Sequence, residues 1–249
     1  MAERRELAEG EVHVYWARPE QILDPDLLAA YRAMLDDEER RRHGCYLFNR
    51  HRHLYLVSHA LARVTLSAYA GAPPAALQFT IGPHGRPDLD PAHGLGRLRH
   101  NLSHTDGLAV CAVARGDIGV DVEDTSRRSS GISIAEHFFA APEVAALRAL
   151  PEPAQRDRFF DYWTLKEAYI KARGMGLALP LGDFAYTLGG PEIQIGFSGT
   201  IEDDPAAWRF RLLEPGRPHR IAVALRRGAG LTVRCFESVP LLSTRPVDL

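Results

Sequence analysis

One strictly alternating segment constrains the fold more than any other part of the chain. Residues 118–124 read Ile-Gly-Val-Asp-Val-Glu-Asp. As a β-strand, this segment places its three β-branched residues on one face. Asp121 and Glu123 then share the other face, about 7 Å apart at two-residue spacing. The solvent face of a half-buried strand often carries two acids. The pair alone is therefore equally compatible with an ordinary surface strand and with a functional site that uses both carboxylates.

A second segment predicts a helix that carries charge in an apolar setting. Residues 163–171 read Trp-Thr-Leu-Lys-Glu-Ala-Tyr-Ile-Lys, and Glu167 and Lys171 lie one helical turn apart on the same side. On a surface such a pair contributes only about 0.2–0.5 kcal/mol. Apolar residues flank it on both sides of the helix: Tyr162, Leu165 and Tyr169 on one, Trp163 and Ile170 on the other. A helix that is apolar on both sides is buried on both sides, so its charges need partners.

Three carboxylates, Asp121, Glu123 and Glu167, predict a metal site if they converge. Two like charges 4 Å apart repel by roughly 4 kcal/mol at an effective dielectric of 20, and a divalent cation reverses the sign of that energy. Oxygen ligands from carboxylates suit Mg²⁺ or Mn²⁺ better than Zn²⁺. The cluster therefore indicates a metal ion together with a phosphate.

Basic and polar residues elsewhere supply candidates for the phosphate itself. Arg52, Arg63 and Arg86 come from different segments, and arginine is well shaped for bidentate phosphate binding. Ser103 and His104 are adjacent, and the chain has no Gly-x-Ser-x-Gly elbow that would indicate a hydrolase. They are interpreted as a polar turn that offers a hydroxyl and an imidazole to a ligand.

Composition and charge exclude several classes of protein. The 249 residues allow one large domain or two small ones, and 45% are apolar. A formal net charge of −2 predicts neither a nucleic-acid nor a membrane partner. Three widely spaced cysteines fit a reducing compartment. The charged N-terminus resembles no signal peptide, and no apolar run reaches the ~18–20 residues of a membrane span. We expect a soluble, cytoplasmic protein.

Helices and short strands are predicted in both halves of the chain. Asp24 is a predicted helix N-cap with Pro25 at the first helical position. Helices are expected over residues 48–69, 134–139, 143–150 and 156–173, and strands over 12–16, 108–113, 208–212, 221–225 and 231–236. A turn over 82–87 should join two short strands. Each half thus mixes helices with a small sheet.

Four of these segments together resemble a known family. Gly-Val-Asp-Val-Glu at 119–123 and the stretch 163–181 are similar to the two signature motifs of the 4′-phosphopantetheinyl transferases, specifically the larger, Sfp-like class. The match extends to Gly-Pro-His-Gly-Arg-Pro-Asp-Leu at 82–89 and Asn-Leu-Ser-His-Thr at 101–105. It covers most of residues 36–184, in the family's order and approximate spacing.

The resemblance implies a fold and an activity. The fold would be α+β, with two similar α/β subdomains (1–117 and 118–249) related by a pseudo-twofold and the active site in the cleft between them. The protein would be a monomer. It would transfer 4′-phosphopantetheine from coenzyme A to a serine of an apo acyl or peptidyl carrier protein in a Mg²⁺-dependent reaction, releasing adenosine 3′,5′-bisphosphate.

The same resemblance implies roles for the charged residues of the two signatures. Asp121, Glu123 and Glu167 would hold Mg²⁺, with Mn²⁺ as an alternative, against the pyrophosphate of coenzyme A. Glu167 is also the candidate general base for the carrier serine, directly or through a metal-bound water. Lys171 would neutralise the phosphate and assist the leaving group.

Binding of the coenzyme A nucleotide is assigned by motif position to residues of the first half. Ser103 and His104 would contact its phosphates, with His104 near the 3′-phosphate. Arg86 stands where the family usually has lysine in a Gly-Lys-Pro turn. Arg52 and His53 are assigned to the same site on a looser pattern.

Two other functions remain open at this stage. A Mg²⁺-dependent coenzyme A pyrophosphohydrolase would release adenosine bisphosphate without a carrier. A non-catalytic protein that binds coenzyme A or a carrier would not need all three carboxylates and Lys171. The pathway of the carrier, whether fatty acid, polyketide or nonribosomal peptide synthesis, is not specified by the sequence.

Overall fold

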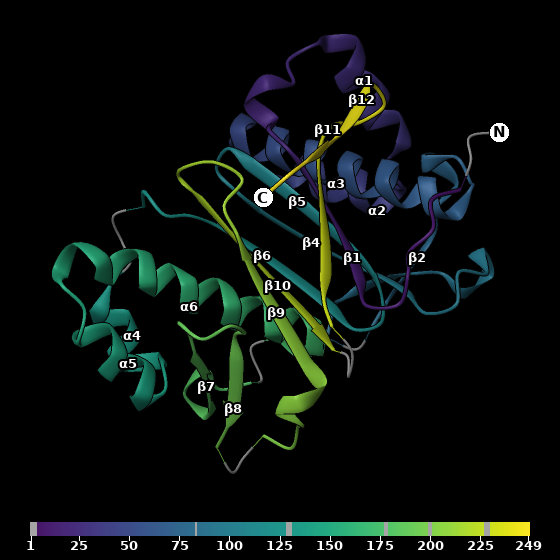
Figure 1. Ribbon diagram of the computed structural model, residues 1–249. Coiled ribbons are helices and arrows are strands. Elements are labelled where there is room, and N and C mark those ends of the chain that lie inside the picture. The colour runs from purple at the N-terminus through teal and green to yellow at the C-terminus, as the bar shows by residue number, and fades with distance from the viewer. Residues whose placement is uncertain (1–3, 83, 128–130, 177–178, 199–200, 227–229) are drawn as a thin grey trace. The chain divides into compact units, whose positions relative to one another are not determined.

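The chain forms two compact units, each with its own sheet and its own core. The computed structural model describes residues 4–82, 84–127, 131–176, 179–198, 201–226 and 230–249. The first unit comprises residues 1–115 together with 232–248, and the second comprises 116–231. Both units mix helices with strands (Figure 1), so the predicted α+β class is confirmed.

The first unit is built on a five-stranded sheet with the order β12-β11-β1-β5-β4. Its strands are β1 (Glu11–Ala17), β4 (Leu98–Thr105), β5 (Leu108–Arg115), β11 (Thr232–Val239) and β12 (Ser243–Val247). β1 pairs with β5 in antiparallel and with β11 in parallel orientation. A separate hairpin joins β2 (Phe79–Ile81) and β3 (Pro87–Leu89), as expected for a turn over residues 82–87.

Three helices lie within the described residues of the first unit. They are α1 (Pro25–Met34), α2 (Asp37–Cys45) and α3 (Asn49–Ala70), with short 3₁₀ turns at η1 (Pro19–Gln21), η2 (Pro74–Ala76) and η3 (Pro91–His93). Asp24 caps α1 as predicted, because its side chain accepts hydrogen bonds from the backbone N–H groups of Asp26 and Leu27. A capping box formed by Asp36 and Glu39 begins α2.

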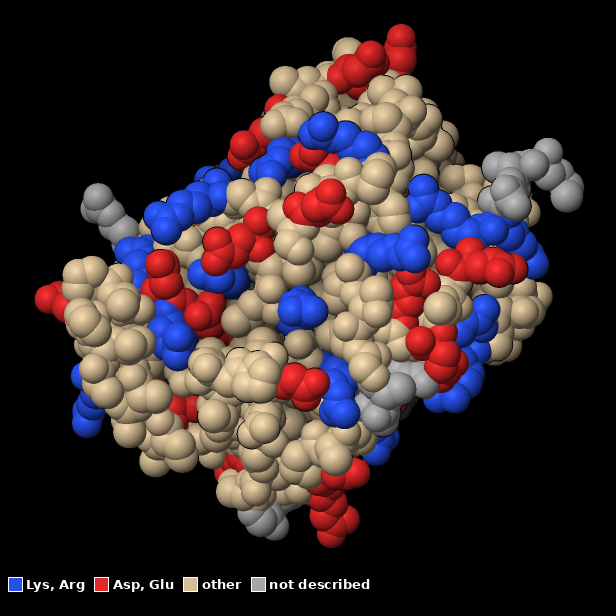
Figure 2. Space-filling model, viewed as in Figure 1, with Lys and Arg blue, Asp and Glu red and all other residues tan. Residues whose placement is uncertain are grey.

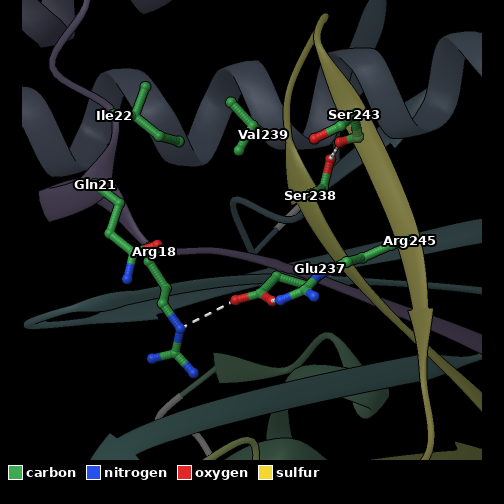
Figure 3. Close-up of a pocket in the computed structure, with 8 residues that line it drawn as sticks. All are labelled: Arg18, Gln21, Ile22, Glu237, Ser238, Val239, Ser243 and Arg245. Atoms are coloured by element: carbon green, nitrogen blue, oxygen red, sulfur yellow. Dashed lines mark hydrogen bonds and ion pairs between the residues drawn. The ribbon is translucent and has the colours of Figure 1, made fainter.

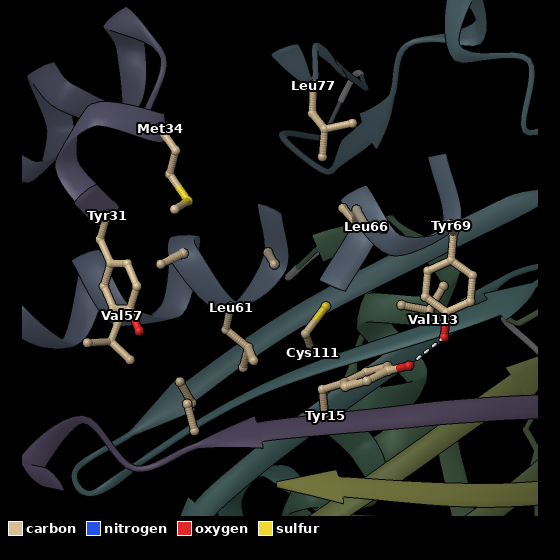
Figure 4. Packing of buried hydrophobic residues seen from close by; sticks show 14 of the residues in the cluster. Tyr15, Tyr31, Met34, Val57, Leu61, Leu66, Tyr69, Leu77, Cys111 and Val113 are labelled. Atoms are coloured by element: carbon tan, nitrogen blue, oxygen red, sulfur yellow. Dashed lines mark hydrogen bonds between the residues drawn. The ribbon is translucent and has the colours of Figure 1, made fainter. Parts of the chain in front are cut away.

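The core of the first unit lies between α3 and the sheet (Figure 4). Leu61 and Leu66 of α3 are fully buried in the same cluster as Cys111 and Val113 of β5. The core also holds polar atoms in pairs, and the Tyr15 and Tyr69 hydroxyls lie 2.7 Å apart in a hydrogen bond (Figure 4). Buried polar groups of this kind are stable only when they are paired.

The second unit is built on a three-stranded sheet with the order β6-β10-β9 and a separate β7–β8 hairpin. Its strands are β6 (Ile118–Asp124), β7 (Phe184–Thr187), β8 (Gln194–Phe197), β9 (Trp208–Leu213) and β10 (His219–Arg226). Its helices are α4 (Ile132–Phe138), α5 (Ala141–Arg148) and α6 (Glu152–Arg173), with 3₁₀ turns η5 (Leu181–Asp183) and η6 (Pro205–Ala207). The long helix α6 ends at Gly174, which adopts a left-handed conformation.

Helix α6 lies unusually close to strand β6. A Cβ atom added at Gly119 would stand 1.9 Å from the carbonyl oxygen of Ala168 and 2.5 Å from the backbone nitrogen of Ala172. Only glycine therefore allows the backbone of α6 to approach β6 at this point. The alternating strand and the charged helix identified from the sequence thus pack directly on one another.

Two segments differ from the expectations. The polar turn predicted at 103–104 is wrong, because Ser103 and His104 lie within strand β4, which ends at Thr105. The tail from Thr232 pairs with β1 in the first unit, whereas the sequence-based division at residue 117 placed it with the second half. The pairing is parallel and joins segments more than 200 residues apart in the chain, so no local pattern reveals it.

Charged side chains of both signs are interspersed on the face shown in Figure 2, in keeping with the formal net charge of −2. Over the described part of the chain, no helix combines the length and the apolar character needed to cross a bilayer.

Candidate functional site

Asp121 is the most deeply buried acid of the two signature segments. It lies in β6 opposite Ala222 of β10, with 4% of its surface exposed. Its Oδ1 atom accepts a hydrogen bond from Nζ of Lys171 at 2.6 Å. This ion pair joins the strand to the last turn of α6, and it is possible because Gly119 lets the helix approach. The strand face that carries the acids is therefore covered by α6 rather than solvent-facing.

Glu123 lies two residues further along the same strand face. Its Oε1 atom accepts a hydrogen bond from Nε1 of Trp163 at 3.1 Å, and its Oε2 atom lies 3.7 Å from Nη1 of Arg127. Burial raises the pKa of Glu123 to about 7, and the nearby charge of Asp121 adds to this rise. Glu123 therefore changes its protonation state near neutral pH.

Glu167 occupies a half-buried position on α6. Burial raises its pKa, the negative charge of Asp121 raises it further, and Lys171 lowers it. Asp121 thus acts electrostatically on both glutamates. The three carboxylates and the lysine form one electrostatic cluster.

The donor atoms of this cluster suit a hard divalent cation, although they do not already enclose one. Over the described residues, no three His, Cys, Asp or Glu side chains are gathered closely enough to hold a metal ion. Asp121 pairs instead with Lys171, and the pKa of Glu123 is raised to about 7. Both features reduce the repulsion among buried acids. Mg²⁺ is nevertheless usually held through one or two carboxylates together with water and substrate phosphates, so the residues fit that ion.

Helix α6 is anchored by a fully buried ion pair next to Glu167. Nζ of Lys166 lies 2.8 Å from Oε2 of Glu143 in α5, and both side chains are completely buried. The same Nζ atom donates hydrogen bonds to the carbonyl oxygens of Leu181 and Phe184, at 2.8 and 2.6 Å. The expectation that charges in this helix have partners is met here in full. Lys166 thus ties α6 to α5 and to the segment that leads into β7.

Three of the basic candidates from the first half have structural partners in the first unit. Arg52 donates a hydrogen bond to the carbonyl oxygen of Tyr46 at 2.7 Å, and His53 donates one to that of Pro19 at 2.8 Å. Arg63 is fully buried and pairs with both Asp36 and Glu39. The buried Arg63 is therefore not a phosphate ligand, and its guanidinium instead holds the start of α2 against α3.

The remaining candidates lie on the β2–β3 hairpin and on β4. Nε of Arg86 lies 3.6 Å from Oδ1 of Asp88, whose other oxygen pairs with Arg99 at 2.5 Å. Ser103 is buried and His104 is exposed, because successive residues of a strand point to opposite faces. The structure thus separates the two side chains that the sequence placed on one turn.

A pocket of the first unit borders the hairpin turn that carries Arg86. It encloses about 180 Å³, and its aromatic walls are Tyr55, His59, Phe79 and His100. Gly85 and Pro87 also line it, as do Arg42 and the acids Asp36, Glu38 and Glu39. Burial lowers the pKa of His100 to about 4, so its imidazole is neutral at physiological pH. The pocket suits a flat, uncharged ring.

A second, more polar pocket of about 450 Å³ lies between η1 and the β11–β12 hairpin (Figure 3). Glu237 is at its centre. Oε1 of Glu237 accepts a hydrogen bond from Nε of Arg18 at 3.1 Å, and Arg245 donates to its other oxygen (Figure 3). The predicted site residues are not among those that line it.

Several residues of the site were not assigned from the sequence. Trp163 was interpreted as an apolar flank of the helix, yet its indole nitrogen holds Glu123. The sequence could have indicated this role, because Trp163 lies four residues before Glu167 and residues four apart share a helix face. No sequence pattern indicates that His100 and Tyr55 line a common pocket, because only tertiary packing brings them together.

The family model and the two relatives below give a consistent result. The model of the 4′-phosphopantetheinyl transferase superfamily matches residues 117–224. The 4′-phosphopantetheinyl transferase HetI of Nostoc sp. is 36% identical over 176 residues, which are 69% of this chain and 72% of that protein. A 4′-phosphopantetheinyl transferase of Bacillus subtilis is 33% identical over 175 residues, covering 70% of this chain and 75% of that protein. The crystal structure of Thermotoga maritima holo-[acyl-carrier-protein] synthase has a TM-score of 0.38 and 18% identity, covering 45% of this chain and 64% of that one.

Proposed function

Because the chain belongs to the 4′-phosphopantetheinyl transferase superfamily, we propose that it transfers 4′-phosphopantetheine from coenzyme A to a serine of an apo acyl or peptidyl carrier protein. The protein is thus an enzyme. The observation that carries the proposal is the cluster of Asp121, Glu123 and Glu167 with Lys171, formed where α6 packs on β6. It offers both carboxylates for a cation and an ammonium group for a phosphate.

Asp121, Glu123 and Glu167 are the proposed ligands of Mg²⁺, or of Mn²⁺ in its place. When bound, the cation would supply charge neutralisation at the pyrophosphate of coenzyme A. Support comes from the electrostatic coupling of Asp121 to both glutamates. Lys171, now paired with Asp121, would exchange this carboxylate for a phosphate oxygen of the substrate and would stabilise the charge that develops on the leaving group.

Glu167 is the proposed general base. It would accept the proton of the carrier serine while the serine Oγ forms a bond to the phosphorus on the pantetheine side. The bond from that phosphorus to the bridging oxygen breaks, and adenosine 3′,5′-bisphosphate leaves with the electron pair. Burial raises the pKa of Glu167, which makes its carboxylate a stronger base than an exposed one.

The first unit is the proposed binding site for the nucleotide half of coenzyme A. The aromatic pocket of Tyr55, His59, Phe79 and His100 would accept the adenine ring by stacking. The cationic and polar candidates for the phosphates remain those assigned from the sequence: Arg52, His53, Arg86, Ser103 and His104. Arg86 has the strongest support, because it belongs to the turn that borders the pocket.

The proposal is tested by incubating the protein with coenzyme A, Mg²⁺ and a panel of apo-carriers, followed by intact-mass measurement. We expect one carrier or more to gain a single phosphopantetheine group, and a chelator to abolish the gain. Release of adenosine bisphosphate without any carrier would instead indicate a pyrophosphohydrolase. Tight binding of coenzyme A with no transfer would indicate a binding protein. The panel also ranks the carriers of fatty acid, polyketide and nonribosomal peptide synthesis.

A monomeric state, a cytoplasmic location and the lack of nucleic-acid or membrane partners stay predictions from the sequence. Size-exclusion chromatography with light scattering checks the first of these.

A further inference from the structure

The turn between α2 and α3 presents two large apolar side chains to solvent. Leu47 is 89% exposed and Phe48 is 62% exposed. They are neighbours in the chain, and they lie between the last residue of α2, Cys45, and the first residue of α3, Asn49. Single exposed apolar residues are common, but adjacent ones of this size and exposure are typical of interaction surfaces.

This turn has a defined conformation, so the exposure is built into the fold. Tyr46 packs its ring against Tyr55 with the centroids 5.3 Å apart, and its carbonyl oxygen accepts the hydrogen bond from Arg52. The Phe48 carbonyl oxygen accepts hydrogen bonds from the backbone nitrogens of His51 and Arg52, both at 3.1 Å. The inner residues therefore fix the turn while Leu47 and Phe48 point outward. A fixed apolar pair loses little entropy when a partner covers it.

The surroundings of the apolar pair are positively charged. Residues 40–53 include five arginines and three histidines and no acid. Arg40, Arg41 and Arg42 pair with acids of α2 itself. Arg50 instead lies over the ring of Phe48, 6.0 Å from its centroid, and within the described residues it makes no ion pair with a carboxylate.

The first turn of α3 adds to this positive field. It contains no acidic residue, and no side chain caps it. The N-terminal end of a helix carries a partial positive charge that acids normally offset. A partner that covers Leu47 and Phe48 and offers carboxylates to Arg50 would bury apolar surface and supply the missing negative charge.

We propose that Leu47, Phe48 and Arg50, here termed the α2–α3 turn surface, form a docking surface for the carrier protein. The inference rests on the proposed function, which requires a protein substrate. The partner face it fits is apolar at its centre and bordered by Asp or Glu side chains. An anionic membrane would offer similar chemistry, but the proposed reaction supplies a protein partner and no lipid.

The test compares Leu47→Ser, Phe48→Ser and Arg50→Glu in steady-state transfer to a carrier that the wild-type enzyme modifies. Because hot-spot residues of this kind contribute a large share of binding energy, each should raise the KM for the carrier by about tenfold. The KM for coenzyme A and the kcat should stay near the wild-type values. Leu23→Ser is the matched control, since Leu23 is 68% exposed in the first unit and its neighbour Ile22 is buried. Unchanged thermal unfolding shows that the variants are folded.

Charge complementarity is tested by a second set of variants. Reversal of single Asp or Glu residues to Lys on the carrier should restore transfer by the Arg50→Glu enzyme for at least one carrier variant. Carrier KM values that equal the wild type in all three enzyme variants would overturn the docking surface and leave the proposed function intact. Absence of transfer by the wild-type enzyme to any carrier would overturn both. A third outcome would assign the turn to a membrane instead. In that case the wild-type enzyme would co-sediment with anionic phospholipid vesicles, the three variants would not, and their KM for the carrier would equal that of the wild type.

Discussion

At the scale of single residues, the position of a carboxylate relative to its neighbours decides its chemistry. Asp121 holds Lys171, whereas the pKa values of Glu123 and Glu167 are raised by burial and by the charge of Asp121. Asp121 is therefore the anion around which the other groups are arranged. Burial raises the pKa of both glutamates, so each is a stronger base than an exposed carboxylate.

The substitution Glu167→Gln tests the proposed base. The amide keeps the size of the side chain but cannot accept the serine proton, so kcat for phosphopantetheine transfer should fall by about 10²–10⁴-fold. Intact-mass assays at saturating Mg²⁺ measure the change. Glu192→Gln, at an exposed position of the same unit, is the control and should transfer at the wild-type rate. A wild-type rate in Glu167→Gln would remove this role.

His100 makes the stability of the first unit depend on pH. Burial lowers its pKa from 6.5 to about 4, so the unfolded chain takes up a proton at higher pH than the folded one. The contribution of His100 is complete above about pH 6.5 and is lost as the pH falls toward 4. The shift of about 2.5 units corresponds to roughly 3 kcal/mol.

Urea unfolding of the wild type and of His100→Gln at pH 7.5 and at pH 4 measures this contribution. The unfolding free energy of the wild type should fall more between the two pH values than that of the variant. Equal pH dependence in both proteins would contradict a buried neutral imidazole.

The sequence predicted which strand face carries Asp121 and Glu123, but not the contacts that their side chains make. Strict alternation is sufficient to place Asp121 and Glu123 on one strand face, because the side-chain period of a strand is fixed. The pairing of Lys171 with Asp121 instead depends on how closely α6 approaches β6. The same is true of the pocket around His100, whose walls come from four separate segments.

At the scale of secondary-structure elements, the site depends on one close contact between a helix and a strand. Replacement of Gly119 by alanine would place a methyl group 1.9 Å from a backbone oxygen of α6. Backbone atoms cannot rotate away, so the helix must shift. We expect destabilisation by about 1–3 kcal/mol and a loss of transfer activity, because Lys171 moves away from Asp121.

Urea unfolding and the transfer assay check both expectations. Gly196→Ala in β8 is the matched control, since a Cβ atom there meets nothing within 4 Å. Activity at the wild-type level in Gly119→Ala would show that the contact between α6 and β6 does not position the site.

The buried pair of Lys166 and Glu143 connects α6 with α5. In Lys166→Met, Glu143 would be left buried without its counter-charge, which typically costs about 3–5 kcal/mol. The exposed pair of Arg148 and Glu136, with side chains 63% and 35% exposed, is the control. Arg148→Met should cost less than about 1 kcal/mol. Denaturant titrations compare the two variants, and equal costs would contradict a structural role of the buried pair.

Two elements show why patterns of apolar residues miss some secondary structure. Helix α2 has no buried residue. It is stabilised by its capping box and by ion pairs three or four residues apart, such as Arg41 and Arg42 with Glu38. Strand β4 lies at the edge of its sheet and mixes buried with exposed polar residues. In both cases the stabilising interactions are polar, so apolar residues do not recur at the spacing typical of a helix or a strand.

At the scale of the whole molecule, the chain leaves the first unit at residue 115 and returns to it at residue 232. Strand β11 pairs in parallel with β1 over six residue pairs from Glu11 to Trp16. The sequence-based division at residue 117 agrees with the first crossing. It does not include the second, because parallel pairing between distant segments leaves no local signal.

Removal of residues 232–249 tests this connection. Without β11, the β1 edge loses its hydrogen-bonding partners, so the backbone amides of β1 should exchange faster with solvent. Those of β6 and β10, which pair with each other in the second unit, should keep their protection. Hydrogen exchange measured by mass spectrometry distinguishes the two sheets, and unchanged protection of β1 would contradict the pairing. Removal of residues 241–249 alone retains β11 and is the control.

The order of these strands in the chain has a consequence for folding during translation. All residues of the second unit emerge as one uninterrupted stretch, so its three-stranded sheet can close as soon as β10 is exposed. Strand β1 is translated before the second unit, and its parallel neighbour β11 is translated after it. The β1 edge of the nascent first unit therefore stays unpaired until β11 has emerged.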